Sequence, residues 1–183
     1  DTAWCFNLLP QLGLPIDHPA MIKAKKFLLD NQILIKGDWQ EKIADIPCGG
    51  WCFENENSLY PDNDDTAAIM MGLYPYRKEE RVKVAAQKAV NWLFAMQCDD
   101  GGWAAFDYQK KVYDCFNYIP FAEHGALLDP PTSDVTGRVI EALGVWGYTL
   151  SDKSVYKAVT WLLEQQEADG SWYGRWGVNY IYG

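Results

Sequence analysis

The chain has 183 residues, 49% of them hydrophobic and 22% charged, a composition typical of a folded domain rather than of a disordered segment. Its formal net charge of −9 argues against nucleic acid as a partner, because nucleic-acid binding requires a basic surface. Aromatic residues make up 15% of the chain, enough to stiffen a core or to line a cavity for a large apolar or cationic ligand.

Disulfide bonding and metal binding find little support in the sequence. The five cysteines are odd in number and include no Cys-x-x-Cys pair, which suits a reducing compartment. With only two histidines, His18 and His124, a conventional zinc site is not expected. No apolar run approaches the roughly 20 residues of a membrane span, which does not exclude an enzyme attached to one leaflet.

A unit of two helices is predicted three times, at about residues 1–39, 65–103 and 134–172. Each unit opens at an Asp, and an apolar helix, a short connection and an amphipathic helix follow; the opening residues are Asp1, Asp65 and Asp134. Repetition at this length predicts an all-α fold of stacked helix pairs, with the more apolar first helices inside.

The second helix of each unit is followed by a Gln, a Gly and a Trp in a constant register. The segment KAVNWL precedes Gln97, Gly101 and Trp103, KAVTWL precedes Gln166, Gly170 and Trp172, and a weaker first copy ends in Gln32, Gly37 and Trp39. We expect a structural role for these residues, in which the Gln side chain bonds free backbone groups and the indole covers them.

The connection at residues 37–61 leads to Asp62, Asp64 and Asp65, three carboxylates within four residues. Like charges this close repel, so in a dry site at least one carboxyl would hold its proton at neutral pH and could give it to a weak base. The same residues suit a helix start, where Asp side chains cap free N–H groups. A loose calcium site is a further alternative, although the EF-hand spacing fails at Ala67 and Leu73.

The connection at residues 101–133 leads to Asp134, which would face the three carboxylates if the units stack in register. Arg138 lies one helical turn further, so the expectation is an ion pair between Arg138 and Asp134 on one helix. A guanidinium at this place would also strengthen any acid beside it. Both connections are long and rich in aromatic residues, which predicts that they form walls over the helix starts.

Four aromatic residues are candidates for lining such a cavity, because a π face attracts a cation more strongly where water is absent. These are Phe53, Phe106, Trp176 and Tyr182. Packing in the core is the alternative for each of them.

Taken together, these motifs resemble those of the squalene–hopene cyclases and related class II triterpene cyclases. The acid motif at residues 62–67 resembles the acid motif of that family, and the Gln-Trp repeats resemble its QW motifs. Further matching segments are GGWCF at residues 49–53, DPP at 129–131 and GRWGVNYIYG at 174–183. The resemblance runs the whole length of the chain.

The resemblance implies a two-domain, all-helical enzyme with an α/α-barrel catalytic domain, of which this chain would be a central part. The implied reaction is protonation of a terminal C=C of a linear polyprene such as squalene, followed by cation–olefin ring closures. By motif position Asp64 is the proton donor, with Asp62 and Asp65 in support. The resemblance also implies that Phe53, Phe106 and Trp176 line the cavity and that Tyr182 lies near the acid.

The resemblance further implies no metal or organic cofactor. Family members are monotopic membrane proteins, so we expect a location on the cytoplasmic face of a bacterial membrane, with the inserting region outside this chain. A homodimer is compatible with this interpretation. An isolated, open part of a barrel is expected to be unstable and inactive by itself.

Two departures from the family pattern bear on the substrate. Arg138 stands where the hopene cyclases carry a His, and Phe106 where many of them have a Tyr. A cyclase of another long linear polyprene, of the C35 type, therefore stays open. The alternatives outside the family are an α/α-barrel glycoside hydrolase, a protein prenyltransferase β-subunit and a non-catalytic helical-repeat binding module.

Overall fold

Helices dominate the structure, a computed structural model that describes residues 1–37, 40, 46–54, 57, 60–108, 129–175 and 180–181. The helices in chain order are α1 (Thr2–Gln11), α2 (Pro19–Asp30), α3 (Asn63–Leu73), α4 (Glu80–Ala95), α5 (Ser133–Val145) and α6 (Lys153–Glu164). A 3-10 turn, η2 (Tyr74–Tyr76), follows α3, and the short strands β1 (Trp51–Cys52) and β2 (Pro61–Asp62) pair antiparallel. Within the described ranges, no helix has the length and apolar character needed to cross a membrane.

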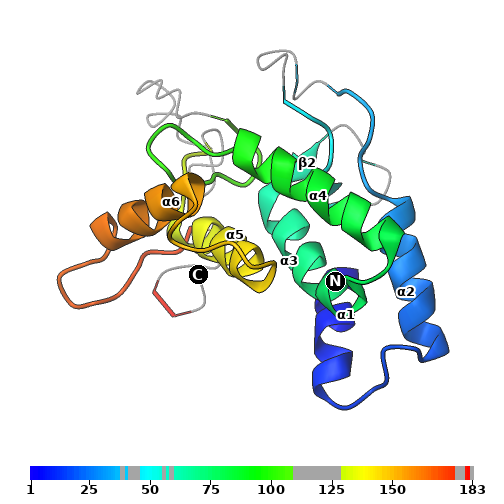
Figure 1. Cartoon of the computed structure of the whole chain (residues 1–183). Helices are drawn as coiled ribbons and strands as arrows, with labels where there is room; N and C mark the ends of the chain where they lie inside the picture. The colour runs from blue at the N-terminus through cyan, green and yellow to red at the C-terminus, as the bar shows by residue number, and fades with distance from the viewer. Residues whose placement is uncertain are drawn as a thin grey trace, which may run out of the picture.

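The helices form two rows, and α3 lies at the centre of the inner row. It packs between α1 and α5, and each of these inner helices pairs with the helix that follows it (Figure 1). Eight of the eleven residues of α3 are buried, whereas α4 buries one face and exposes the other. The predicted all-α arrangement of stacked helix pairs is confirmed; of the first helices, α3 is mostly buried, whereas α1 buries only Ala3 and Phe6.

Small residues let the inner helices approach closely. A Cβ atom added to Gly72 of α3 would lie 2.6 Å from the ring of Phe6 on α1, closer than side-chain contacts allow. Asn7 of α1 also donates from Nδ2 to the carbonyl of Ala68 at 2.8 Å. These contacts fix α1 against α3 over its length.

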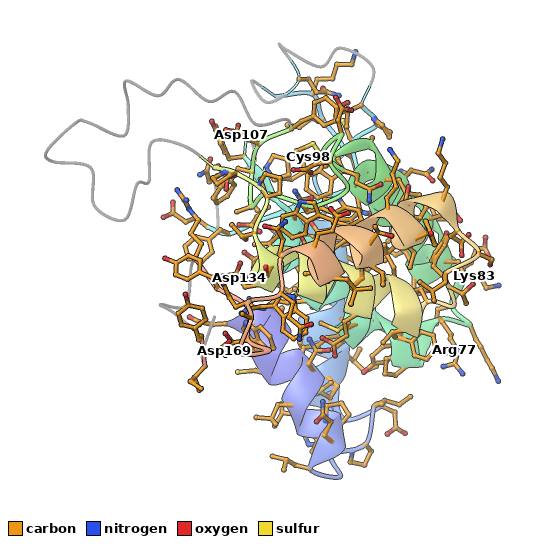
Figure 2. The ribbon with its side chains drawn as sticks, turned by 90° about the vertical axis from the view of Figure 1, so that its left-hand side faces the viewer. Arg77, Lys83, Cys98, Asp107, Asp134 and Asp169 are labelled. Atoms are coloured by element: carbon orange, nitrogen blue, oxygen red, sulfur yellow. The ribbon has the colours of Figure 1, made fainter. Side chains whose placement is uncertain are left out.

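The inner helices α3 and α5 run parallel, so that their N-terminal ends lie together. Arg138 contacts Asp64 near the start of both helices, and Trp146 Nε1 donates to Met70 O at 2.8 Å near their ends. Figure 2 shows Asp134 on one side of the molecule and Arg77 and Lys83 on the opposite side. Any chemistry at the N-terminal ends is therefore far from the turns that follow these helices.

The Gln and Trp residues of the repeat tie one unit to the next. Gln97 Nε2 donates to Gly101 O and, across to α6, to Ser154 O, both at 2.8 Å, while Trp103 Nε1 donates to Leu93 O at 2.7 Å. Gly101 holds a positive φ of 107°, where a Cβ would lie 2.8 Å from Lys157 O. In the last unit the equivalent bonds run from Gln166 to Gly170 O and from Trp172 to Leu162 O.

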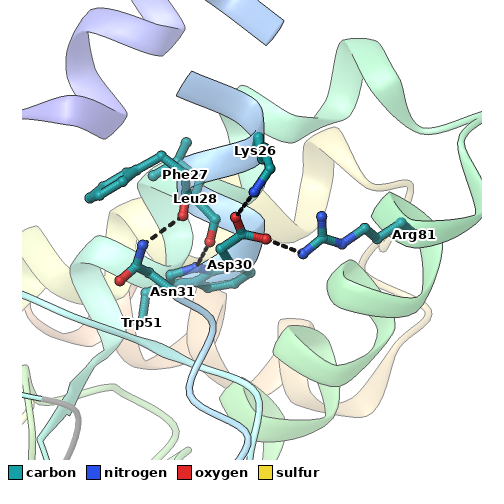
Figure 3. Close-up of polar contacts among 7 residues, drawn as sticks. All are labelled: Lys26, Phe27, Leu28, Asp30, Asn31, Trp51 and Arg81. Atoms are coloured by element: carbon teal, nitrogen blue, oxygen red, sulfur yellow. Dashed lines mark hydrogen bonds and ion pairs between the residues drawn. The ribbon is translucent and has the colours of Figure 1, made fainter. Parts of the chain in front are cut away.

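The first unit closes later in the chain than its sequence suggests. Gln32 Nε2 donates to Gly49 O and Ala85 O. Trp51 Nε1 donates to Leu28 O (Figure 3). The partners of Gln32 thus belong to the Gly49–Trp51 segment and to α4, not to the nearer Gly37 turn. Trp39, which the sequence places in this role, lies outside the described residues.

Ion pairs join the outer helices α2 and α4 across their exposed faces. Asp30 accepts from Lys26 on its own helix and from Arg81 of α4, the latter at 2.6 Å (Figure 3). Exposed pairs of this kind contribute little to stability, because water and salt screen them.

The starts of α3 and α5 occupy equivalent places in the repeat. The backbone N–H of Trp51 donates to Thr66 Oγ1, and that of Trp103 donates to Thr136 Oγ1, both at 2.9 Å. Thr66 and Thr136 therefore correspond, and so do Asp64 and Asp134, which each stand two residues earlier. The sequence alignment of Asp65 with Asp134 is thus wrong by one residue, because the inner helices are offset by 70 residues and the outer helices by 69.

Candidate active site

Asp62 begins α3 and serves as its N-cap. Its Oδ1 accepts the backbone N–H groups of Asp64 at 2.6 Å and Asp65 at 3.1 Å, and the residue is 5% exposed. A short polar side chain at this place satisfies amides that no helical carbonyl can reach. The structural role expected for these aspartates is therefore real for Asp62, and it leaves Asp64 and Asp65 free for other contacts.

Burial and repulsion favour the protonated forms of two of the three carboxyls. Burial raises the pKa of Asp62 to about 8, the charges of Asp65 and Asp64 add to this, and the two amide bonds oppose it. Burial and the charge of Asp64 raise the pKa of Asp65 to about 6. At pH 7 the cluster therefore keeps a proton, chiefly on Asp62.

One carboxyl oxygen of Asp64 accepts a hydrogen bond, and the other has no partner among the described residues. Arg138 Nη1 of α5 donates to Asp64 Oδ2 at 2.5 Å, and the two side chains are 31% and 29% exposed. Asp64 Oδ1 is buried and has no hydrogen-bond partner among the described residues. The lone pairs of this oxygen are therefore not used by any described donor.

The partner of Arg138 differs from the one that its sequence position suggested. The expected ion pair joined Arg138 to Asp134 within α5, whereas the structure pairs Arg138 with Asp64 on the neighbouring helix. Parallel packing of α3 and α5 brings this about, because it puts Asp64 level with the first turn of α5. The carboxylate of Asp134 accepts the backbone N–H of Val135 at 3.0 Å.

Trp4 is a site residue that the sequence did not single out. The Arg138 guanidinium carbon lies 5.5 Å from the centre of the Trp4 ring, within the range of a cation–π contact. Trp4 lies on the first turn of α1, so that all three inner helices contribute to the site. Its position one turn after Asp1 would have been the signal, had the parallel stacking of the inner helices been known.

The two described aromatic candidates have different surroundings. Phe106 is half-buried, and its ring meets that of Tyr60, just before β2, with centroids 5.9 Å apart in an edge-on arrangement. Phe53 is 72% exposed and lines a cavity of about 230 Å³ together with Asp65 and Trp51. Trp176 and Tyr182 lie outside the described residues.

Asp129 is a further, half-buried carboxylate near this end of the molecule. It accepts three backbone N–H groups from residues 105–107, and burial nevertheless raises its pKa. Across the described ranges, no group of three or more His, Cys, Asp and Glu side chains is arranged to hold a metal ion. The site thus combines carboxyls that hold a proton at neutral pH with a guanidinium bound to Asp64.

Comparison with known proteins identifies relatives along the entire chain. The profile of the squalene-hopene cyclase C-terminal domain matches residues 1–183. The squalene–hopene cyclase of Alicyclobacillus acidocaldarius is 43% identical over 100% of this chain and 29% of its own length. That of Bradyrhizobium diazoefficiens is 44% identical over 100% of the chain and 28% of its own length. The sporulenol synthase of Bacillus subtilis is 39% identical over 100% of the chain and 28% of its own length. The chain thus spans less than a third of these relatives.

Proposed function

The chain belongs to the family of the squalene–hopene cyclase C-terminal domain, and from this premise we propose that it carries the proton donor of an enzyme that cyclises a linear polyprene. The observation that carries this proposal is the state of Asp64. Its Oδ2 accepts a hydrogen bond from Arg138, and its Oδ1 is buried without a hydrogen-bond partner among the described residues. Two neighbouring carboxyls have raised pKa values. We propose that residues 1–183 form part of one α/α-barrel catalytic domain, built from these helix pairs.

In the proposed first step, the proton that the carboxyl cluster keeps passes to Asp64 Oδ1 and from there to the terminal C=C of the substrate. The O–H bond breaks, a C–H bond forms, and the electron pair of the O–H bond stays on the carboxylate, leaving a tertiary cation on the substrate. An alkene is a very weak base, so the reaction needs a strong acid. Arg138 supplies this strength, because its guanidinium stabilises the carboxylate that proton transfer leaves behind.

The other carboxyls keep a proton within the cluster. Asp62 and Asp65, whose pKa values are raised to about 8 and about 6, hold protons close to Asp64. We propose that they return a proton to Asp64 after each turnover. Arg138 is a poor relay for this purpose, because its guanidinium does not give up a proton in a protein.

The aromatic residues are proposed to stabilise the cations that follow. Phe106, beside Tyr60, and Phe53, on the cavity shared with Asp65, offer π faces near the acid. Phe and Trp can stabilise a cation without adding to it. The proposal includes Trp176 and Tyr182 only because of their motif positions, which would put Tyr182 near the acid. It includes Asp134 only because this residue lies level with Asp64.

Two substrates are proposed, in order. Squalene comes first, because the family description and most of the similar proteins name squalene–hopene cyclases. A longer, C35 linear polyprene comes second, and the observation favouring it is Arg138, which stands where the hopene cyclases have a His. We further propose attachment to the cytoplasmic face of a membrane through a part of the protein outside this chain.

The test uses the full-length protein in detergent, incubated with squalene or with a C35 linear polyprene, and identifies products by gas chromatography–mass spectrometry. Cyclised product is expected from one of the two, and Asp64→Asn should abolish it while the protein stays folded by circular dichroism. Asp30→Asn, which removes an exposed carboxylate of α2, is the matched control and should retain activity. A folded parent that cyclises neither substrate would contradict the proposal.

A further inference from the structure

One carboxylate holds three consecutive backbone amides at the wall of the candidate site. Asp129 Oδ1 accepts the N–H of Ala105 at 3.1 Å, and Oδ2 accepts those of Phe106 at 2.6 Å and Asp107 at 2.9 Å. Asp129 follows these residues by more than 20 positions in the sequence. Hydrogen bonds to a charged acceptor are among the stronger ones, so this contact fixes the backbone around Phe106.

The opposite edge of the same segment is bound to the first residue of α3. Asn63 N donates to Ala105 O, and Asn63 Nδ2 donates to Ala104 O, both at 2.8 Å. Asn63 stands directly between Asp62 and Asp64, and it is fully buried. The segment 104–107 is therefore held between the acid motif on one edge and Asp129 on the other.

Phe106 takes its position from this double attachment. Its amide is one of the three that Asp129 binds, and its ring rests edge-on against Tyr60. Phe53, at the other wall, is 72% exposed, whereas Phe106 is half-buried. The structure thus holds one of the two described aromatic candidates in a defined place relative to the acids.

We propose that Asp129 is a positioning residue: by binding the amides of residues 105–107 it fixes the ring of Phe106 relative to Asp64 and thereby decides which intermediate cation is stabilised. This inference rests on the proposed cyclisation. Without the carboxylate, the ring is displaced from the cation that it stabilises. That cation then ends the sequence early by losing a proton from a neighbouring carbon to water, and the C–H electron pair forms the C=C of a partially cyclised alkene.

The experiment compares Asp129→Ala with Phe106→Ala in the full-length protein, on whichever polyprene the parent cyclises. Asp129→Ala is expected to give the same partially cyclised alkenes as Phe106→Ala, with a lower kcat for the complete product and little change in KM. Asp129→Asn keeps an acceptor for two of the three amides and should fall between Asp129→Ala and the parent. An unchanged product ratio in an active Asp129→Ala protein would overturn the inference.

A matched control separates positioning from loss of stability. Asp152 also accepts a backbone N–H, that of Thr149 at 2.8 Å, but in the turn before α6, away from the acids. Asp152→Ala should lower the Tm without producing partially cyclised alkenes. If it produces them too, the effect of Asp129→Ala is one of general destabilisation and the inference fails.

A second readout does not depend on turnover. Hydrogen–deuterium exchange of the full-length protein should show the amides of residues 105–107 exchanging about tenfold faster or more in Asp129→Ala, because three bonds to a charged acceptor are lost. Unchanged exchange would overturn the inference even in a protein without activity. If Asp129→Ala exchanges faster but the parent makes no cyclised product, the result supports the anchoring and contradicts the proposed function.

Discussion

The starts of α3 and α5 share one backbone arrangement but carry different chemistry. In each, a Thr hydroxyl accepts the backbone N–H of a Trp from the preceding connection, Trp51 to Thr66 and Trp103 to Thr136. The N-cap of α3 is Asp62, which binds two amides, whereas the N-cap of α5 is Thr132, whose hydroxyl is buried without a hydrogen-bond partner among the described residues. The repeat thus supplies the frame, and substitution within the frame supplies the acid.

The two helix starts also complement each other in charge. The start of α3 brings three carboxylates and no cation, and α5 brings Asp134 and, one turn later, Arg138. Because α3 and α5 run parallel, Arg138 reaches Asp64 across the interface. The candidate site therefore depends on the difference between the two units as much as on their likeness.

The largest expected effect comes from Asp64, which Arg138 binds across the α3–α5 interface. Asp64→Asn should lower kcat by about a hundredfold to ten-thousandfold or more, because the side chain loses its acidic proton. Asp134→Asn, the equivalent change on α5, should have a clearly smaller effect. The measurement is cyclised product per time by gas chromatography. Equal losses in the two variants would show that the acid is not confined to α3.

Removing the cation that joins the two helices should have the next largest effect. Arg138→Gln should lower kcat roughly a hundredfold, because the carboxylate formed in the first step loses its charged donor. Arg138→Lys keeps the charge but not the planar fork, and should recover only part of the activity. Steady-state kinetics on the preferred polyprene measures both. Full activity of Arg138→Gln would remove Arg138 from the mechanism.

The raised pKa of Asp62 predicts a stability that falls with pH. In the unfolded chain the pKa of Asp is near 3.8, and in the folded protein that of Asp62 is about 8, so the folded state binds more protons between these values. The contribution of Asp62 is therefore complete below pH 3.8 and is lost as the pH rises to about 8. Urea unfolding of the full-length protein should show that Asp62→Asn removes the part of the decline due to Asp62 and leaves the part below about pH 6 that Asp65 contributes.

Asp30 offers a control of opposite sign. Its hydrogen bonds to Arg81 and Lys26 lower its pKa, so its contribution is present at neutral pH and disappears as the pH falls below the usual range of an Asp. Asp30→Asn should accordingly leave the decline between pH 4 and 8 intact. A parent whose stability rises across that window, relative to Asp62→Asn, would contradict the raised pKa of Asp62.

The shared frame predicts two nearly equal losses of stability. Thr66→Val and Thr136→Val each leave a buried Trp N–H without its acceptor, which costs about 1–3 kcal/mol of unfolding free energy. Neither hydroxyl has a proposed part in the chemistry, so kcat should change little at a temperature where both variants are folded. Chemical denaturation of the two variants measures the loss. A large loss in one and none in the other would show that the two starts are not equivalent.

The sequence predicts the helix pairs well and their contacts less well. Apolar periodicity identifies the helices because it reports burial of one face, and the Gln-Trp register identifies the turns. This register places the first Trp of the repeat at Trp39, because the sequence does not show that Gln32 bonds to Gly49 rather than to the nearer Gly37 turn. It also pairs Arg138 with its neighbour Asp134, because the parallel packing that brings Asp64 to Arg138 appears only in three dimensions.

The least predictable parts of the site are contacts between segments far apart in the chain. Nothing in the spacing of Asp129 indicates that its carboxylate returns to residues 105–107, since the intervening connection can fold back in many ways. Trp4 is another example, because it comes next to Arg138 only when α1, α3 and α5 stack in one row. Clustered carboxylates, by contrast, are visible in sequence because neighbours in the chain cannot be far apart.

The smallest expected effects concern the Gln residues at the ends of the outer helices. Gln97 is partly buried and bonds both Gly101 O and Ser154 O, whereas Gln166 is exposed and its described bond is to Gly170 O alone. Trp103 is fully buried and Trp172 is 37% exposed. From these contacts alone, Gln97→Ala should cost about 1–2 kcal/mol, one typical hydrogen bond or two, and Gln166→Ala about half a kcal/mol or less.

The same pair of variants in the full-length protein tests whether the row of helices continues. If a further helix pair stacks on α6 as α6 stacks on α4, it supplies the acceptor that Ser154 supplies to Gln97, and Gln166→Ala should then cost as much as Gln97→Ala. Urea unfolding of both variants of the full-length protein, each against the parent, gives the two values. A Gln166→Ala loss that stays small in the full-length protein would mean that the repeat, and with it the proposed barrel, does not extend past α6.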